Sequence, residues 1–324
     1  MIREMYIDKT LGCLLGGLIG DAMGAPVEGW HYDKIKQEKG WIDDFEGDGT
    51  DDSAIKSILC EALIKYSGHI TADEFAESFL NNPQHYNLFF VPVRNMFHKI
   101  QDEIDLPVNA GINNAASSSS AMCISPMGIV NACDPRQAAI ETYDVAGLIH
   151  SDKTSFCRDA ACAIAAAVAE AMKPSATVDT IIDAGTKYLH PKSAHVMTAK
   201  INEVMGLARA STGYEDFRER FYETCLYNLI CDSRETVPCV FALFYLAQGD
   251  PVKAICMAAN FGRDSDTLAT MAGALAGAYR GVDALRNDWV AKVRCERQEE
   301  LAAALVDLIE LRAKEKREWL KFIE

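Results

Sequence analysis

Two acidic segments that lie far apart in the sequence have the same layout and carry side chains that could bind a metal ion. Residues 47–53 read Gly-Asp-Gly-Thr-Asp-Asp-Ser, and residues 262–267 read Gly-Arg-Asp-Ser-Asp-Thr. In each segment glycine gives the backbone freedom to turn, acids and a threonine follow, and a helical pattern starts at once. Carboxylate and hydroxyl oxygens, with no obvious His or Cys partner, favour Mg²⁺ or a similar hard cation over zinc.

Helix capping is the simpler explanation for each segment, because Asp, Ser and Thr are favoured at N-caps and acids stabilise the positive end of a helix. One acid would be enough for that role, yet the two segments together contain Asp48, Asp51, Asp52, Asp264 and Asp266. Side chains two residues apart do not share a helix face, so the last two converge only if the chain turns at the helix entrance. If the segments meet in space, bound cations would have to offset the repulsion among the carboxylates.

Helical periodicity dominates the rest of the chain, and alternating strand patterns are nearly absent. Acid–proline pairs mark two helix starts, Asp134-Pro135 and Asp250-Pro251. Residues 159–172 and 268–279 are so rich in small side chains that we expect central helices with close neighbours. The expected helices span residues 10–24, 53–66, 71–81, 92–101, 135–149, 155–172, 178–188, 194–205, 214–222, 237–248, 251–260, 268–279 and 284–318. The prediction is a mostly α-helical single domain over residues 1–324.

The composition excludes several classes of protein. The 324 residues include 32 Lys and Arg against 47 Asp and Glu, and this net charge of −15, without a basic cluster, argues against nucleic-acid binding. A hydrophobic content of 49% is typical of a folded chain rather than a disordered one. None of the 11 cysteines forms a Cys-x-x-Cys pair, so we expect reduced, mostly buried thiols.

No targeting or membrane segment is expected. The N-terminus carries acids where a secretory signal would have its apolar core. The longest apolar runs, near residues 160–172 and 237–247, are shorter than the roughly 20 residues that a membrane-spanning helix needs. We therefore expect a cytoplasmic protein with no membrane partner.

Several pieces of the sequence resemble the ADP-ribosylglycohydrolase family, the DraG and ARH group. They are residues 16–28, 49–52, 121–122, 148–151 and 262–267, the last followed by a helix rich in Ala and Gly. The paired Thr-Asp-Asp and Asp-x-Asp-Thr motifs, in this order, are specific to that family. The resemblance implies an all-α, compact single-domain orthogonal helical bundle of the ADP-ribosylglycohydrolase type, with a binuclear Mg²⁺ or Mn²⁺ centre.

The resemblance also implies a set of site residues. The metal ligands would be Thr50, Asp51, Asp52, Asp264, Asp266 and Thr267, and the catalytic residues would be Asp52, Glu28 and Asp264. Glu28 or Asp52 could be the general base. The implied activity is a Mg²⁺-dependent glycohydrolase that cleaves an N- or O-glycosidic bond at the anomeric carbon of an ADP-ribosyl or smaller ribosyl substrate. Two Mg²⁺ ions would hold the attacking water and bind the ribose hydroxyls.

The sequence departs from the family at the substrate loop. Residues 117–120 are serines where many members have a Gly-Asn-Gly motif, and Cys123 replaces an arginine. Hydroxyl groups suit a sugar or nucleoside, so we favour a small-molecule partner over an ADP-ribosylated protein. The expected substrate contacts are Ser118, Ser119, Ser120, Asn114, His150 and Arg263. For His150, substrate contact and a structural hydrogen-bonding role are equally expected.

Several alternatives stay open. Asp21 could orient the metal ligands or form only an interhelical hydrogen bond. Tyr86, Phe89 and Phe90 could stack on a base or belong to the core. A non-catalytic protein that kept the fold is one rival function. A metal-dependent phosphohydrolase is another, although Arg263 is the only evident phosphate clamp. The sequence indicates no oligomeric state.

Overall fold

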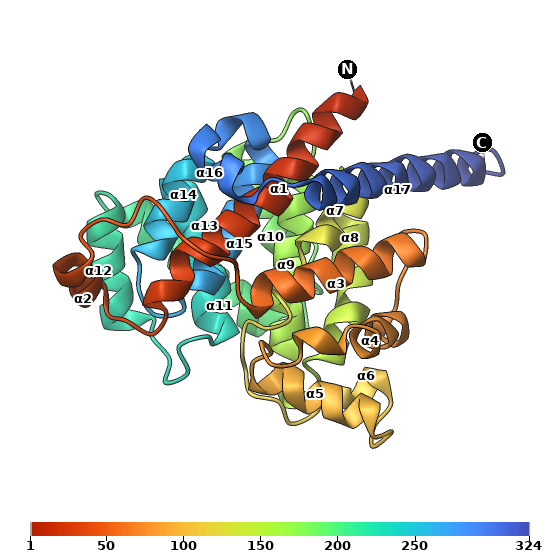
Figure 1. Cartoon of the computed structure of the whole chain (residues 1–324), viewed down its shortest axis with the longest axis horizontal. Helices are drawn as coiled ribbons and strands as arrows, with labels where there is room; N and C mark the ends of the chain where they lie inside the picture. The colour runs from red at the N-terminus through yellow and green to blue at the C-terminus, as the bar shows by residue number, and fades with distance from the viewer. Residues whose placement is uncertain (1, 324) are drawn as a thin grey trace.

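The computed structural model describes residues 2–323, and within that range the chain forms α-helices and short 3₁₀ turns but no β-strand. The α-helices are α1 (Ile2–Gly24), α2 (Tyr32–Glu38), α3 (Asp51–Lys65), α4 (Ala72–Leu80), α5 (Val91–Gln101), α6 (Pro107–Ala110), α7 (Ser125–Val130), α8 (Pro135–Val145), α9 (Ser155–Ala171), α10 (Val178–Lys187), α11 (His195–Ala210), α12 (Tyr214–Thr224), α13 (Ser233–Leu246), α14 (Pro251–Ala259), α15 (Ser265–Arg280), α16 (Asn287–Val293) and α17 (Glu296–Leu320). Figure 1 shows α1 and α15 near the middle of the molecule, with α4, α5 and α6 gathered at one end. The prediction of an all-α fold is confirmed.

Two helix starts that the sequence predicted from capping residues are present. Asp134 Oδ1 accepts a hydrogen bond from the Gln137 amide at 3.1 Å, at the start of α8. Asp250 Oδ1 accepts one from the Lys253 amide at 3.0 Å, at the start of α14. Because these carboxylates satisfy first-turn amides that have no partner within the helix, both helices begin where the sequence indicated.

The helix predicted over residues 284–318 is wrong in its extent. The structure divides it into α16 and α17, with Arg294 and Cys295 in extended conformations between them. The cause is tertiary, because Trp289 Nε1 donates a hydrogen bond to the Asp43 carbonyl at 3.2 Å and ties α16 to the loop before α3. The short helices α2, α6 and α7 were not predicted, since segments of this length show little periodicity.

A close contact between α1 and α15 lies at the centre of the fold. A Cβ atom added at Gly12 would lie 2.5 Å from the Gly277 carbonyl oxygen, and one added at Gly20 would lie 2.9 Å from the Thr270 amide nitrogen. Side chains larger than hydrogen therefore do not fit between the two backbones. The segments predicted to be central helices, within α9 and α15, are buried along most of their length, as expected.

The segment Ile2–Val27, which contains α1, is long and apolar enough to cross a membrane by length and composition. However, 83% of its most apolar window is buried inside the molecule. The core helix of a folded protein passes the same test, so this composition is accounted for by the packing of α1 against α15 and its neighbours.

Enlarging a glycine in this contact should destabilise the protein. We expect Gly20→Ala to lower the free energy of unfolding by about 1–3 kcal/mol, because the added methyl group overlaps the backbone of α15. Urea unfolding followed by circular dichroism measures the change. Gly206→Ala is the control, because nothing lies within 4 Å of a Cβ atom there. Alanine at that exposed position in α11 should stabilise the helix by up to about 1 kcal/mol. Equal effects of the two substitutions would contradict the close contact.

Candidate metal centre

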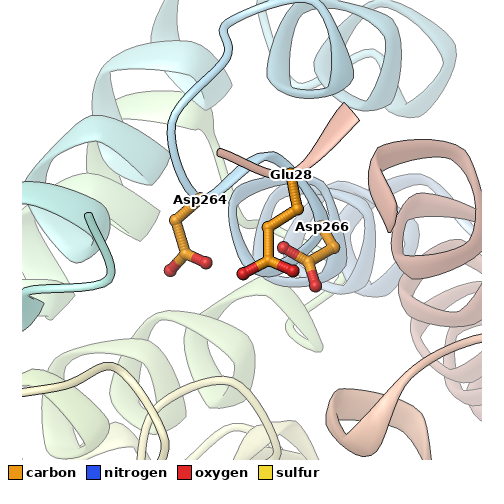
Figure 2. Close-up of side chains that lie close together, drawn as sticks. All are labelled: Glu28, Asp264 and Asp266. Atoms are coloured by element: carbon orange, nitrogen blue, oxygen red, sulfur yellow. The ribbon is translucent and has the colours of Figure 1, made fainter. Parts of the chain in front are cut away.

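Three carboxylates from two distant parts of the chain meet at one point. One oxygen from each of Glu28, Asp264 and Asp266 lies within 4.8 Å of the others. Figure 2 shows the three side chains grouped together. Glu28 follows the 3₁₀ turn Ala25–Val27 at the end of α1, whereas Asp264 directly precedes α15 and Asp266 lies in its first turn. A single cation could therefore bind all three groups.

A tight turn at the entrance of α15 makes this convergence possible. Arg263 has a φ of +62°, in the left-handed region. Its amide donates a hydrogen bond to the Trp30 carbonyl at 2.9 Å, and the Gly29 amide donates one to the Arg263 carbonyl at 2.7 Å. Ser265 Oγ donates another to the Gly24 carbonyl at 2.9 Å. These bonds attach the segment after α1 to the helix entrance. The chain turns there, which is the condition under which Asp264 and Asp266 can converge.

The first acidic segment is held by Asp21, a buried residue of α1. Its carboxylate accepts hydrogen bonds from the Thr50 amide at 2.9 Å, the Ser53 amide at 3.0 Å and the Ser53 hydroxyl at 2.5 Å. Thr50 is the N-cap of α3, and its own hydroxyl accepts a hydrogen bond from the Asp52 amide at 3.3 Å. These bonds position the start of α3. They join α1 to α3 and also orient the first acidic segment, so they fit both roles that were open for Asp21.

Both acidic segments line one cavity of about 570 Å³. The expected site residues that line it are Glu28, Thr50, Asp51, Asp52, Ser118, Ser119, Asp264, Asp266 and Thr267. Asp48 is exposed and does not line this cavity. All six residues expected as metal ligands therefore line the same cavity.

Burial and mutual repulsion raise the pKa of these carboxyl groups. Asp52 and Asp264 are 1% and 2% exposed, and desolvation followed by neighbouring acids raises the pKa of each well above its ordinary value. Desolvation, Glu28 and Asp21 raise the pKa of Asp266 to about 8. Among the described residues, Asp52 Oδ2 and Asp266 Oδ1 are buried without a hydrogen-bond partner. A cation would satisfy such oxygens, so this donor set fits a hard divalent metal.

Only part of the serine loop reaches the cavity. Ser118 Oγ donates a hydrogen bond to Asp264 Oδ2 at 3.1 Å, and Ser119 lines the same space. Ser120 does not line it, and its hydroxyl donates to the Cys157 carbonyl at 3.2 Å. The loop therefore brings Ser118 and Ser119 to the cavity that the acidic segments line, whereas the Ser120 hydroxyl bonds to α9.

His150 and Asn114 are outside the cavity lining and support the loop. His150 is buried, with Nδ1 at 2.9 Å from Ser120 Oγ and Nε2 at 3.0 Å from the Ala115 carbonyl oxygen. Burial lowers the pKa of His150 to about 4, so the ring is neutral near pH 7. Asn114 Nδ2 donates a hydrogen bond to the Ile149 carbonyl at 2.7 Å. Of the two roles expected for His150, these contacts fit the structural one.

Arg263 does not line the cavity either. Its Nε and Nη2 donate to the two carboxylate oxygens of Glu235 at 2.7 and 2.8 Å, and Nη2 also donates to the Tyr227 carbonyl at 2.5 Å. Arg263 lines a neighbouring pocket together with Trp30 and Tyr222. The ion pair with Glu235 therefore neutralises the guanidinium charge of Arg263, which adjoins the second acidic segment in the sequence.

The cavity is also lined by residues that the sequence did not mark as site residues. They are Leu88, Val91, Arg94, Met122, Leu229, Ile230 and Cys231. Phe89 and Phe90, considered for base stacking, line it as well, and the Phe90 amide donates to Asp51 Oδ2 at 2.8 Å. Arg94 donates to the Asn87 carbonyl at 2.9 Å, and its buried Nε has no partner in the described chain. No sequence signal marked Arg94, because a single arginine in a helix is ordinarily a surface residue.

Comparisons with known proteins point to one family. The sequence matches the ADP-ribosylglycohydrolase family over residues 3–316. YegU of Escherichia coli K12 is 29% identical over 305 residues, which cover 87% of this chain and 90% of YegU. The ADP-ribosyl-[dinitrogen reductase] glycohydrolase of Rhodospirillum rubrum is 26% identical over 318 residues, which cover 94% and 96% of the two chains. The ADP-ribosylhydrolase ARH3 of Gallus gallus is 23% identical over 322 residues, with 86% and 87% covered.

A solved structure shares the fold. It is described as an ADP-ribosylglycohydrolase-related protein complex, with a TM-score of 0.72, 21% identity, and coverage of 94% of this chain and 99% of that one. The family match spans nearly the whole chain, so the resemblance inferred from the acidic motifs is confirmed. The chain belongs to the ADP-ribosylglycohydrolase family, whose members are hydrolases that cleave glycosidic bonds.

Proposed function

We propose that this chain is a Mg²⁺-dependent glycohydrolase that cleaves the N- or O-glycosidic bond at the anomeric carbon of an ADP-ribosyl or smaller ribosyl substrate. The observation that carries the proposal is the cluster of carboxylates around one cavity, namely Glu28, Asp51, Asp52, Asp264 and Asp266. One oxygen from each of Glu28, Asp264 and Asp266 lies within 4.8 Å of the others, and Asp51 and Asp52 line the same space. Bound cations would favour the ionised form of these carboxylates near neutral pH. Because the acids come from two helix starts, we propose two ions.

The residues proposed to hold the two Mg²⁺ ions, with Mn²⁺ as the alternative, are Thr50, Asp51, Asp52, Asp264, Asp266 and Thr267. All offer the oxygen atoms that hard divalent cations prefer. Such ions, when bound, supply Lewis-acid chemistry that activates a water and polarises substrate oxygens. The carboxylates offset the charge of the two ions, so that the site does not repel the positive charge that develops at the anomeric carbon in an oxocarbenium-like transition state.

We propose Glu28 as the group that accepts the proton of the attacking water. Its side chain is exposed at the cavity, beside Asp264 and Asp266, on a segment outside the helices. Desolvation and the charge of Asp21 raise the pKa of Glu28 toward the range in which a general base works best. Asp52 is almost completely buried among the proposed ligands, so metal binding suits it better than proton transfer.

We propose that hydroxyl, aromatic and cationic groups of the cavity bind the substrate. Ser118 and Ser119 offer hydroxyl groups to a ribose. Phe90, which is 40% exposed, offers a face for a nucleobase, and Arg94 offers a positive charge to a phosphate. The Rhodospirillum rubrum relative acts on an ADP-ribosylated protein. The hydroxyl-rich loop of this chain nevertheless favours a small ribosyl or ADP-ribosyl molecule as substrate.

We also infer a single domain over residues 1–324 that acts in the cytoplasm, without nucleic-acid or membrane partners. The family match over residues 3–316 supports one domain. All 11 cysteines are free, which is typical of a reducing compartment. The net charge of −15 disfavours binding to nucleic acid.

Two rival functions predict different products. A metal-dependent phosphohydrolase would use the same carboxylates but release phosphate instead of a reducing sugar. A non-catalytic family member would bind its ligand without turnover. Both acidic segments are complete in this chain, which favours an enzyme.

Loss of one carboxylate should weaken metal binding. We expect Asp264→Asn to reduce Mg²⁺ affinity at least about tenfold, on the order of 1.4 kcal/mol, because a buried oxygen ligand loses its charge. Isothermal titration calorimetry measures the affinity. Asp48→Asn is the matched control, because Asp48 is exposed and does not line the cavity. Wild-type affinity in a folded Asp264→Asn variant, or no Mg²⁺ or Mn²⁺ binding at all, would contradict the metal centre.

The metal-free protein should lose stability as pH rises from about 6 to 8. An Asp carboxyl has a pKa of about 3.9 when unfolded. Burial and nearby acids raise the pKa of Asp266 to about 8 in the folded state, which therefore binds protons that the unfolded state has released. This contribution is complete below the unfolded pKa and is lost as pH rises through the folded one. We expect Tm in chelator to fall across this window and saturating Mg²⁺ to remove most of the fall. A rising Tm in chelator would refute the prediction.

Turnover should occur on small ribosyl compounds. The protein is incubated with Mg²⁺ and a panel of nucleosides, ADP-ribose derivatives and ADP-ribosylated arginine or serine peptides, and the released sugar is measured. We expect Glu28→Gln to lower kcat by about 10²-fold or more at Mg²⁺ concentrations that saturate the variant, in which Asp264 and Asp266 still offer carboxylates to the cation. Turnover only on the peptides would overturn the small-molecule preference, and release of phosphate would favour the phosphohydrolase. An unchanged kcat in Glu28→Gln would exclude Glu28 as the base.

A further inference from the structure

A second cavity, of about 300 Å³, lies between α8, the first half of α9 and the connection from α10 to α11. Its lining residues are Ala139, Ile140, Tyr143, Asp159, Cys162, Leu189, His190 and Ser193, none of which lines the metal cavity. Cys157, whose carbonyl bonds to the serine loop, lies two residues before Asp159 and therefore faces another side of α9. This space is separate from the proposed catalytic site.

Asp159 is a buried carboxylate without a partner in the described chain. The residue is 4% exposed, yet none of the hydrogen bonds or ion pairs of residues 2–323 involves its carboxylate oxygens. The neighbouring Arg158 is engaged elsewhere, because its guanidinium stacks 3.8 Å from the Tyr143 ring and its Nε donates to the Tyr143 carbonyl at 2.8 Å. The Asp159 oxygens are not among the fully buried polar atoms of the described residues that lack a partner, so they face the cavity, where a bound donor would pair with them in place of water.

Two histidines are the other titratable neighbours of Asp159. His190 lines the cavity and His195 begins α11, and both side chains are exposed. Neither ring forms an ion pair with Asp159, and His195 Nδ1 lies 3.2 Å from the Lys192 carbonyl oxygen instead. Burial raises the pKa of the Asp159 carboxyl to about 6, with Arg158 and the two histidines opposing the rise, so the group is mostly ionised near pH 7.5.

The rest of the cavity is mainly apolar. Ala139, Cys162 and Leu189 are buried side chains, and Ile140 is 57% exposed. The Cys162 thiol donates to the Ala139 carbonyl at 3.2 Å, so it already has a partner. One carboxylate with apolar walls does not suit a bare Mg²⁺ or Ca²⁺ ion, which needs several oxygen ligands. An anion would be repelled by Asp159, and an uncharged hydrocarbon would leave the carboxylate unpaired.

We propose that this cavity binds a small organic ammonium ion whose apolar body packs against Tyr143 and Leu189 while its N–H groups donate to Asp159. A volume of about 300 Å³ is at the lower end of the range for small-molecule sites, so the ligand is a compact one. The site is independent of the proposed glycohydrolase reaction, because the two cavities share no lining residue.

The test uses benzylamine, which is an ammonium ion at pH 7.5, and benzyl alcohol as its uncharged counterpart. Calorimetry is performed on the full chain with saturating Mg²⁺, so that the carboxylates of the metal cavity are neutralised and do not compete for the ammonium ion. We expect benzylamine to bind at least about tenfold more tightly than benzyl alcohol. Asp159→Asn should abolish this difference. Asp183→Asn, which changes an exposed acid of α10, should leave it intact.

The position of binding is checked by nuclear magnetic resonance of the methyl groups of Ile140 and Leu189. Benzylamine should shift both signals in the wild-type protein, which requires no variant to fold. Equal affinities for the two ligands, unchanged benzylamine affinity in a folded Asp159→Asn variant, or shifts confined to residues outside the cavity would each overturn the proposal.

Discussion

The close contact between α1 and α15 is the constraint on which the rest of the site depends. Hydrogen is the only side chain that fits at Gly12 and Gly20, so the two backbones pack against each other along much of their length. This contact brings the end of α1 to the start of α15, where Ser265 Oγ bonds to the Gly24 carbonyl. Asp21, on the same part of α1, then holds the start of α3. One helix pair thus sets the relative positions of all the acidic residues.

This arrangement places several acidic side chains together in a buried site, which is electrostatically unfavourable. Desolvation, followed by neighbouring acids, raises the pKa of Asp52, Asp264 and Asp266, and two of their oxygens lack hydrogen-bond partners in the described chain. Lys56, one turn after Asp52 in α3, is also buried with an unpartnered ammonium group. Groups arranged in this way oppose folding unless a ligand compensates them, which is common at functional sites and uncommon elsewhere. These uncompensated buried groups therefore support a binding role for the cavity between the starts of α3 and α15.

The positions of the two arginines beside the site depend on residues from other helices. Arg263 lies next to an acidic motif in the sequence. For that reason it was the one residue expected to bind a phosphate. Glu235, which is far from it in the sequence, engages its guanidinium group and holds it outside the cavity. Arg94 has no motif around it, yet it lines the cavity with an unpartnered Nε. Charge partners that come from other helices decided both outcomes, and no local pattern encodes them.

The sequence by itself determined the all-α class, most helix positions, the acidic motifs and the family, because periodicity, capping and motif spacing are local properties. It also required a turn at the entrance of α15 if Asp264 and Asp266 were to converge, because side chains two residues apart do not share a helix face. Only the tertiary structure decided that both acidic segments line one cavity and that residues 284–318 form two helices. It also decided that His150 bonds to the serine loop from outside the cavity. Those outcomes depend on contacts between residues that are distant in the sequence. Such contacts contribute to stability only after the helices have packed together.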